Sequence, residues 1–259
     1  MVAYRQGNMS IAGARSADTI PAAPAVAIHS RVRCLLGAGG DLVDIRQDAV
    51  GAIGLTLVDV SGHGPEAAPA ASRVREVLAG LDEQDRNQHT WVHDLNTRLC
   101  EVLDGDRFSA TLSARVHATT RPGTLGMTVV NAGMPTPFVY RTATGNVERV
   151  ANGAPPLGVF DEDSWLPEAI RLTLDSGDVV VFVTDGVTET CRGDGERYGF
   201  DRVVSLIATV GRAGGAAVLS ELSQAVARFR DGERVEDDVS IVVIEARSAE
   251  STAAEPVAA

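Results

Sequence analysis

Four turns of this chain place an aspartate at the end of an apolar run, beside a glycine or a second aspartate. They are Gly39-Gly40-Asp41, Asp59-Val60-Ser61-Gly62-His63-Gly64, Thr184-Asp185-Gly186 and Asp237-Asp238. A carboxylate at the end of a strand is held on a rigid scaffold, and a neighbouring glycine lets the backbone approach a ligand closely. Carboxylate, carbonyl and water oxygens are the ligands that Mg²⁺ and Mn²⁺ prefer. The four turns together indicate a divalent-cation site, although each one alone is more typical of an aspartate that caps its own backbone.

Other catalytic motifs fail at specific positions. Ser61 lacks the Gly-x-Ser-x-Gly elbow of a hydrolase nucleophile, because Asp59 stands where the first glycine belongs. The glycine-rich segment 37–40 does not continue as a dinucleotide-binding loop, because Leu42 stands where the third glycine belongs. The sequence also contains no His-Glu-x-x-His zinc motif. These three chemistries are therefore disfavoured.

Apolar and alternating runs predict the strands that must carry the aspartate turns. The predicted strands are 53–60, 108–117, 125–131, 179–184 and 239–245, and the predicted helices are 65–78, 90–103, 200–210 and 216–230. Pro65 stands at a natural first helical position, and Thr90 is a suitable cap for the second helix. Few strands are separated by a crossover helix, so the pattern favours an α+β domain in which paired helices cover mainly antiparallel sheets.

Composition and charge limit the possible partners and surroundings. The chain has 259 residues, 44% of them hydrophobic, and no stretch approaches the ~20 apolar residues of a membrane span. A net charge of −12 argues against nucleic acid or an anionic membrane surface as a partner. The cysteines, Cys34, Cys100 and Cys191, match no zinc or disulfide framework. This predicts free thiols in a reducing cytoplasm, with Cys34 and Cys100 in the core.

Sustained apolar periodicity is confined to the middle of the chain. Residues 1–27 show none and contain the stiff segment PAAPA, so we expect an unstructured lead. Residues 248–259 are mostly Ala, Glu, Ser and Pro and are expected to form a disordered tail. No internal repeat or linker divides residues 28–247, which we therefore expect to form one domain.

Seven segments of the chain, taken in order, resemble the motifs of the protein phosphatase 2C (PPM) superfamily. They are GGDLVD, LVDVSGHGPEAA, FSATLSARV, VNAGMPTPFVY, GAPPLGV, SGDVVVFVTDGVTE and EDDVSIVV. The resemblance extends over about residues 31–246 and is strongest to the bacterial branch typified by the sporulation phosphatase SpoIIE and its stress-response relatives. It implies an αββα sandwich of two mainly antiparallel sheets flanked by helices.

The resemblance also assigns roles to the aspartates. Asp59 matches the aspartate that bridges two metal ions, and the backbone carbonyl of Val60 is the expected next ligand. Asp41 matches an acidic position that acts through coordinated water. Asp185 and Asp237 match the remaining ligands, so Asp59, Asp185 and Asp237 are the expected catalytic aspartates.

Four further residues are expected beside the ligands or on the substrate side. Asp44 and Asp238 match positions next to the ligands, and Asp238 stands where asparagine is frequent, which suggests hydrogen bonding rather than ligation. Gly186 belongs to the same turn as Asp185. His63 is either a proton donor to the leaving group or a loop residue that tethers the turn, and the second role is favoured.

The resemblance implies a protein serine/threonine phosphatase that uses two divalent cations, Mn²⁺ or Mg²⁺, and the water they share. The expected substrate is a phosphorylated anti-sigma factor antagonist, a STAS-type domain, in a partner-switching pathway. The alternatives are a pseudophosphatase that binds and occludes its partner without catalysis, and an enzyme for a small phosphate ester. Phosphate release with and without Mn²⁺ distinguishes a phosphatase from the pseudophosphatase. Comparing the turnover of a phosphorylated protein with that of small esters distinguishes a protein phosphatase from an enzyme for small phosphate esters.

Two positions depart from the family pattern. Leu42 stands where the first motif has an aromatic residue, and Met134 stands where the NAG turn continues with histidine. Neither is an expected metal ligand. Both are expected near the substrate cleft, where they would affect substrate preference.

Overall fold

The structure is a computed structural model of the whole chain. The residues that it describes are 3–5, 26–33, 39–48, 51–62, 64–81, 88–104, 106–150, 153–160, 167–232 and 237–247.

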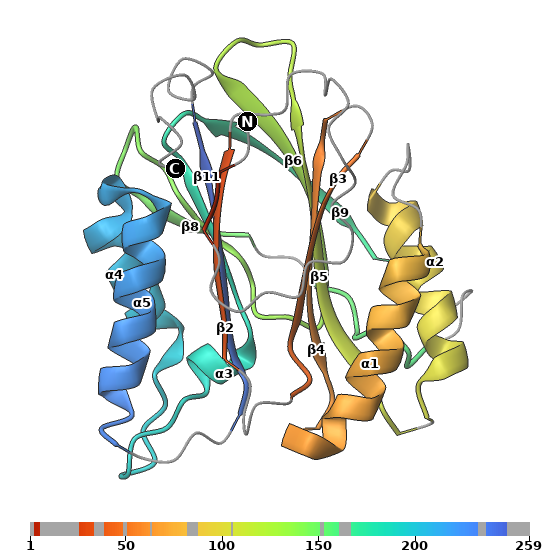
Figure 1. Cartoon of the computed structure of the whole chain (residues 1–259). Coiled ribbons are helices and arrows are strands. Elements are labelled where there is room, and N and C mark those ends of the chain that lie inside the picture. The colour runs from red at the N-terminus through yellow and green to blue at the C-terminus, as the bar shows by residue number, and fades with distance from the viewer. Residues whose placement is uncertain are drawn as a thin grey trace, which may run out of the picture.

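Two β-sheets lie face to face in the middle of the molecule (Figure 1). The six-stranded sheet has the order β1 (Ala3–Arg5), β2 (Val26–Arg33), β11 (Val239–Ala246), β10 (Val179–Val183), β7 (Phe138–Tyr140) and β8 (Val147–Arg149). The five-stranded sheet has the order β3 (Leu42–Gln47), β4 (Ile53–Val60), β5 (Ser109–Ala118), β6 (Thr124–Ala132) and β9 (Ala169–Asp175). Apart from the parallel pair β1–β2, the paired strands described are antiparallel.

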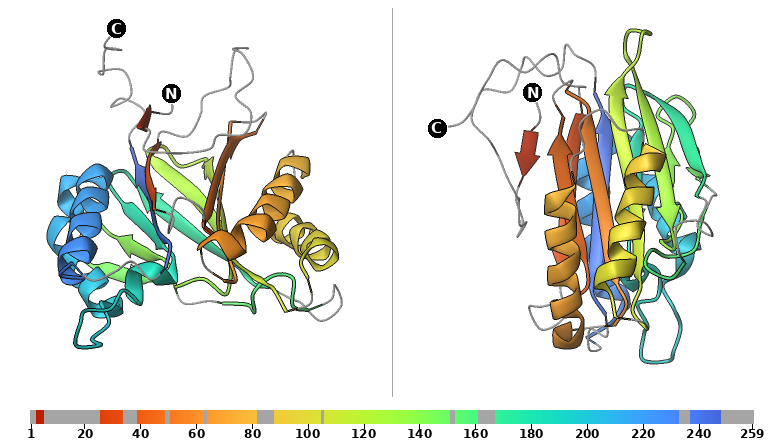
Figure 2. Two further views of the ribbon diagram at one scale, coloured as in Figure 1. Left: turned by 60° about the horizontal axis from the view of Figure 1, so that its bottom comes forward. Right: turned by 90° about the vertical axis from the view of Figure 1, so that its right-hand side faces the viewer.

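Helices cover the outer face of each sheet (Figure 2). The helices α1 (Gly64–Gly80) and α2 (Gln88–Val102) lie outside the five-stranded sheet. The helices α4 (Gly199–Val210) and α5 (Gly215–Phe229), joined by the 3-10 turn η2 (Gly211–Ala213), lie outside the six-stranded sheet. A single-turn helix, α3 (Asp185–Thr188), follows β10 directly. The molecule is therefore an αββα sandwich, as predicted.

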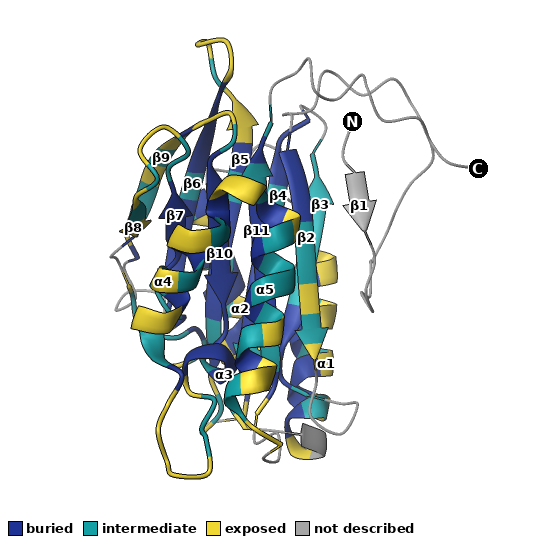
Figure 3. Cartoon of the chain, turned by 90° about the vertical axis from the view of Figure 1, so that its left-hand side faces the viewer, coloured by how far each residue is buried: buried dark blue, intermediate teal, exposed yellow. Residues whose placement is uncertain are grey.

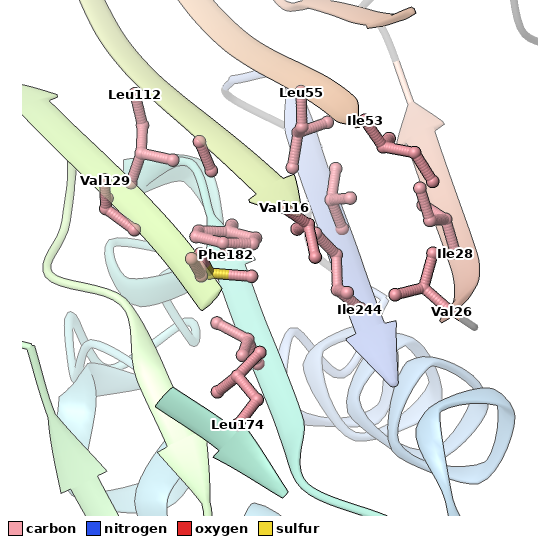
Figure 4. Close-up of a cluster of buried hydrophobic side chains, with 14 of the residues drawn as sticks. Val26, Ile28, Ile53, Leu55, Leu112, Val116, Val129, Leu174, Phe182 and Ile244 are labelled. Atoms are coloured by element: carbon pink, nitrogen blue, oxygen red, sulfur yellow. The ribbon is translucent and has the colours of Figure 1, made fainter. Parts of the chain in front are cut away.

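The innermost strands are apolar on both faces because each sheet is covered on both sides. In β10, Val180 and Phe182 point into the cluster between the sheets, while Val181 packs toward α4 and α5. In β4, Leu57 belongs to the cluster between the sheets and Val58 to the one beneath α1 and α2. Alternate residues of a strand point to opposite faces, so this double burial requires a continuous apolar run. Figure 4 shows the cluster between the sheets, and Figure 3 shows the buried strands behind the partly exposed α4 and α5.

The longest predicted elements are confirmed. The five predicted strands correspond to β4, β5, β6, β10 and β11, and the four predicted helices to α1, α2, α4 and α5. The strands that were not predicted are β1, β2, β3, β7, β8 and β9, together with the short helix α3.

Two expectations about the ends and the cysteines differ from the structure. The expected boundary at residue 28 falls inside β2, which begins at Val26, and the expected lead contains β1. Cys100 is exposed rather than in the core, because it follows the buried Leu99 on the outer side of α2. Cys34 and residues 248–259 lie outside the described residues, so the predictions for them stay predictions.

The packing between the sheets can be tested at Phe182, which is fully buried. Phe182→Ala is expected to lower the free energy of unfolding by about 3–5 kcal/mol, because it removes apolar contacts and leaves a cavity. Urea denaturation measures the change. Arg171→Ala, on the exposed side of β9, is the control and should change it by less than about 0.5 kcal/mol. A similar small effect at Phe182 would contradict the described core.

Candidate metal centre

Strand direction brings the aspartate turns to one end of the sandwich. The antiparallel strands β3 and β4 pair Leu42 with Val58, so the start of β3 and the end of β4 lie side by side at one end of the sheet. The antiparallel pair β10–β11 is in register at Val183 and Ile241, so the end of β10 and the start of β11 meet in the same way. The turns lie at the lower ends of both sheets in Figure 1, beside α3.

Hydrogen bonds join the two sheets at this end. The backbone N–H of Asp41 donates to Oδ2 of Asp238 over 3.3 Å. The hydroxyl of Thr184 donates to Oδ2 of Asp41 over 3.0 Å and accepts from the backbone N–H of Ser240, also over 3.0 Å. Thr184 and Ser240 are fully buried, and Asp41 and Asp238 nearly so. These contacts fix Asp41, at the end of the five-stranded sheet, against the turns at the end of the six-stranded sheet.

Glycines allow the backbone to pack closely around the carboxylates. A Cβ on Gly40 would lie 2.5 Å from the carbonyl oxygen of Val60, and one on Gly186 would lie 1.9 Å from the carbonyl oxygen of Asp238. A Cβ on Gly39 would collide with the carboxylate of Asp238 itself. The glycines beside the aspartates are therefore required by close approach, as the sequence suggested.

Burial and mutual repulsion raise the pKa values of the carboxyl groups. The pKa of Asp59 is raised to about 8, first by burial and then by the negative charges of Asp185, Asp237 and Asp238. Burial also raises the pKa of Asp41 well above its usual value, and the charge of Asp59 adds to the effect, while the Ser240 and Thr184 hydroxyls oppose it. The Asp59 and Asp185 side chains share a hydrogen bond, which requires one of the two carboxyl groups to be protonated. The raised pKa of Asp59 favours the proton on Asp59.

The centre is closed on one side and open on the other. Asp41 and Asp238 are buried, Asp59 and Asp185 are half-buried, and Asp237 is exposed. Burial is the main cause of the raised pKa of Asp185, and the nearby charge of Glu189, an exposed residue after α3, is the next. A ligand would therefore reach the carboxylates from the side of Asp237.

The donor set suits a divalent cation. Buried carboxylates that repel one another and raise one another's pKa values are stabilised by a cation, and oxygen ligands match Mg²⁺ and Mn²⁺. Within the described ranges, no three His, Cys, Asp or Glu side chains are already arranged as ligands around one point. The carboxylates form a cluster that a cation would draw together, which couples metal binding to proton release.

The structure separates Asp44 from this cluster, which corrects the expectation for that residue. The carboxylate of Asp44 lies 2.6 Å from Nε of Arg46 in an ion pair. The guanidinium of Arg46 also donates to the carbonyls of Leu78 and Leu81 at the end of α1. Asp44 is therefore on the helix-covered face of β3, three residues beyond Asp41, where it pairs with the Arg46 side chain that fastens the strand to α1.

The other candidate residues are distributed as follows. Asp238 accepts the hydrogen bond from Asp41, the kind of contact its position suggested. His63 lies outside the described residues. Leu42 is buried beneath α1 and α2, and Met134 in the cluster between the sheets, so the two departures from the family pattern contribute to packing instead of facing a cleft.

Sequence reasoning missed Thr184, Ser240 and Arg107. The signal for the first two was a hydroxyl residue next to an aspartate turn, at the end of β10 and near the start of β11. Arg107 donates from Nη1 to the carbonyl of Ser61 over 3.0 Å and lies beside Gly62, whose φ of 101° favours glycine. No local pattern connects Arg107 with Ser61, because they are far apart in the sequence.

Comparisons with solved structures identify the class of fold. The PP2C domain of SiaA from Pseudomonas aeruginosa matches with a TM-score of 0.69 and 16% identity, over 84% of this chain and 85% of that chain. The RsbU and RsbW domains of Rv1364c from Mycobacterium tuberculosis match with a TM-score of 0.65 and 21% identity, over 88% of this chain and 62% of that one. The catalytic domain of the serine threonine protein phosphatase PstP, solved with two manganese ions, matches with a TM-score of 0.56 and 16% identity, over 86% and 99%. The fold is that of PP2C phosphatase domains.

The family follows from the sequence comparison. The model of the stage II sporulation protein E (SpoIIE) family matches residues 49–247, well over half of the chain. The chain therefore belongs to the SpoIIE family. The search of curated proteins found no match. None of the helices in the described part of the chain is long and apolar enough to cross a membrane.

The raised pKa of Asp59 predicts how stability depends on pH in metal-free protein. The unfolded-state pKa of an aspartate is about 3.9, so the folded state binds this proton more tightly. The contribution of Asp59 to stability is therefore present below about pH 4 and is lost as the pH rises toward about 8. Calorimetric melting in chelator from pH 5 to 8.5 should show a falling Tm, and Asp59→Asn should flatten the fall. An equal fall in the variant would contradict the assignment.

Proposed function

We propose that this chain is a metal-dependent protein phosphatase that removes phosphate from serine or threonine side chains. The observation that carries the proposal is the meeting of Asp41, Asp59, Asp185 and Asp237 at one end of the two sheets, with raised pKa values for the first three. Membership of the SpoIIE family and the PP2C fold support it.

The proposed ligands are Asp59, Asp185, Asp237 and the carbonyl of Val60, with Asp41 acting through water. Divalent cations bound there would neutralise phosphate charge and lower the pKa of a water that can attack phosphorus. The chain itself would orient the donors: the hydroxyl of Thr184 holds the Asp41 carboxylate, and strand pairing fixes Asp59. The proton held on Asp59 would have to leave before that carboxylate could act as a ligand.

The exposed side of the centre suits a phosphate group carried on a larger molecule. The exposed Asp237 and half-buried Asp185 leave the cluster open to solvent on one side, while Asp41 and Asp238 close the other. A phosphoserine or phosphothreonine that projects from a protein surface could reach such an open centre. Catalysis by positioned charge needs no covalent intermediate on the chain.

The proposed substrate is a phosphorylated anti-sigma factor antagonist with a STAS-type domain. Its support is the resemblance to SpoIIE and its stress-response relatives, together with the match to a structure that contains RsbU and RsbW domains. Mn²⁺ and Mg²⁺ are the proposed cations, and a relative solved with two manganese ions supports the first. The proposed location is the cytoplasm, where such a substrate would be found.

Phosphate release from a phosphoserine peptide tests the proposal. Wild type should release phosphate with Mn²⁺ and lose the activity in excess chelator. Asp59→Asn and Asp185→Asn should each lower kcat by about 10²-fold or more, because each removes a charge that would hold the cations. Asp44→Asn should stay within about threefold of wild type, because Asp44 is on the face of β3 that α1 covers, and Asp175→Asn, at an exposed residue of β9, is a second control.

Two outcomes would contradict the proposal. Full activity in excess chelator would remove the role of a cation. No release under any divalent metal, with the peptide still bound, would favour a chain that occludes its partner without catalysis.

A further inference from the structure

Exposed apolar side chains gather at one place on the molecule. In the described part of the chain, the large hydrophobic residues that are exposed are Phe108 at 39%, Val159 at 51% and Phe160 at 42%. Single exposed hydrophobic residues are ordinary, but a group of them marks an interaction site. Whether these three residues mark an interaction site therefore depends on whether they lie together on the surface.

The three residues lie on two neighbouring segments. Ser109 and Leu157 form an antiparallel bridge, with Ser109 N–H donating to the Leu157 carbonyl over 2.9 Å and Leu157 N–H to the Ser109 carbonyl over 2.8 Å. Phe108 directly precedes one side of this bridge, and residues 158–160 directly follow the other. We call the surface of Phe108, Val159 and Phe160 the apolar ledge.

The apolar ledge is tied to the metal centre. The N–H of Phe108 donates to Oγ of Ser61 over 3.0 Å, and the N–H of Ser61 donates to the carbonyl of Phe108 over 2.9 Å. Ser61 is two residues after Asp59, and Asp59 itself is paired with Ala110 on β5. Phe108 is two residues from Ala110, which is about 7 Å along an extended chain. A molecule whose phosphate reaches the carboxylates would therefore have its neighbouring atoms close to Phe108.

The far side of the apolar ledge is held by α2. Asn96 is fully buried, and its side chain donates to the carbonyl of Phe160 over 3.1 Å and accepts from the N–H of Gly158 over 2.9 Å. A Cβ on Gly158 would lie 2.9 Å from Leu103, and its φ of 81° favours glycine. The segment is thus fastened to the helix by its backbone while Val159 and Phe160 face outward. A rigid apolar surface loses little conformational entropy when a partner binds.

Charge explains why apolar contacts would be needed beside this centre. The chain carries a net charge of −12, and the centre itself is a group of aspartates. Cations at the centre would attract the phosphate itself, but the net negative charge of the chain gives the rest of an anionic phosphoprotein no long-range attraction. Short-range apolar contacts are then a source of affinity for the residues around the phosphate. A small phosphate ester would be too small to use them.

We propose that the apolar ledge binds apolar residues next to the phosphorylated serine or threonine of a protein substrate. The inference rests on the proposed function and deepens it by naming a sequence preference. The chain would favour phosphorylated sites flanked by large hydrophobic residues over sites flanked by small polar ones.

A matched pair of phosphoserine peptides tests the preference. One peptide carries Leu and Phe within three residues of the phosphoserine, and the other carries Ser and Gly there with the same net charge. With Mn²⁺, wild type should have a kcat/KM about 10-fold higher for the apolar peptide, the effect expected from burying part of one or two large side chains. The double variant Phe108→Ser with Phe160→Ser should reduce that ratio to about 2 or less, mainly through KM.

Two controls separate docking from damage to the centre. Turnover of p-nitrophenyl phosphate should stay within about twofold of wild type in the double variant, because this ester does not extend beyond the centre. Phe108→Leu with Phe160→Leu keeps apolar side chains at both positions and should retain most of the preference. Equal losses on the peptides and the ester would contradict a docking role.

Other outcomes overturn the inference without ambiguity. Equal kcat/KM for the two peptides in wild type, or a preference that survives the serine variants, would remove the docking role. A wild-type dimer that the serine variants dissociate in sedimentation would make the ledge an interface between copies. If no phosphate is released from any compound, the proposed function fails, and fluorescence anisotropy with the same two peptides still decides whether the ledge binds apolar residues.

Discussion

The arrangement depends on the repulsion among aspartates that the two sheets hold together at one end. Burial and neighbouring charge raise the pKa of Asp59 to about 8 and that of Asp41 well above its usual value. Strand pairing prevents these groups from moving apart: Asp59 is the last residue but one of β4, and Asp41 directly precedes the neighbouring strand β3. The fold thus holds negative charge in a position that favours a divalent cation or a proton.

The surrounding structure can be understood as support for this charged end. The apolar layers on both faces of β4 and β10 make the sheets rigid, and the Thr184 hydroxyl links one sheet to the other through Asp41. The Asp44–Arg46 pair fastens β3 to the end of α1. The bonds between Ser61 and Phe108 extend the same rigid frame from the centre to the molecular surface. Precise placement of a site requires such supporting contacts.

Sequence patterns predicted the parts of the fold that are governed by local periodicity. The strands buried on both faces, such as β4 and β10, are long apolar runs and were found, as were the four amphipathic helices. Strand β3 was missed because Asp44 and Arg46 interrupt its apolar pattern, and their pairing with each other and with α1 depends on the tertiary structure. The meeting of the aspartates was predictable from four similar turns, whereas Thr184, Arg107 and the displaced Asp44 required knowledge of which strands are neighbours.

Isothermal titration calorimetry with Mn²⁺ at pH 7 measures whether the aspartate cluster binds divalent cations. We expect two ions to bind per chain with release of protons, because the raised pKa keeps Asp59 largely protonated before binding. The measured heat should therefore change with the ionisation enthalpy of the buffer, and Asp59→Asn should weaken binding and reduce that dependence. Absence of binding, or binding that Asp59→Asn leaves unchanged, would rule out a cation site at these aspartates.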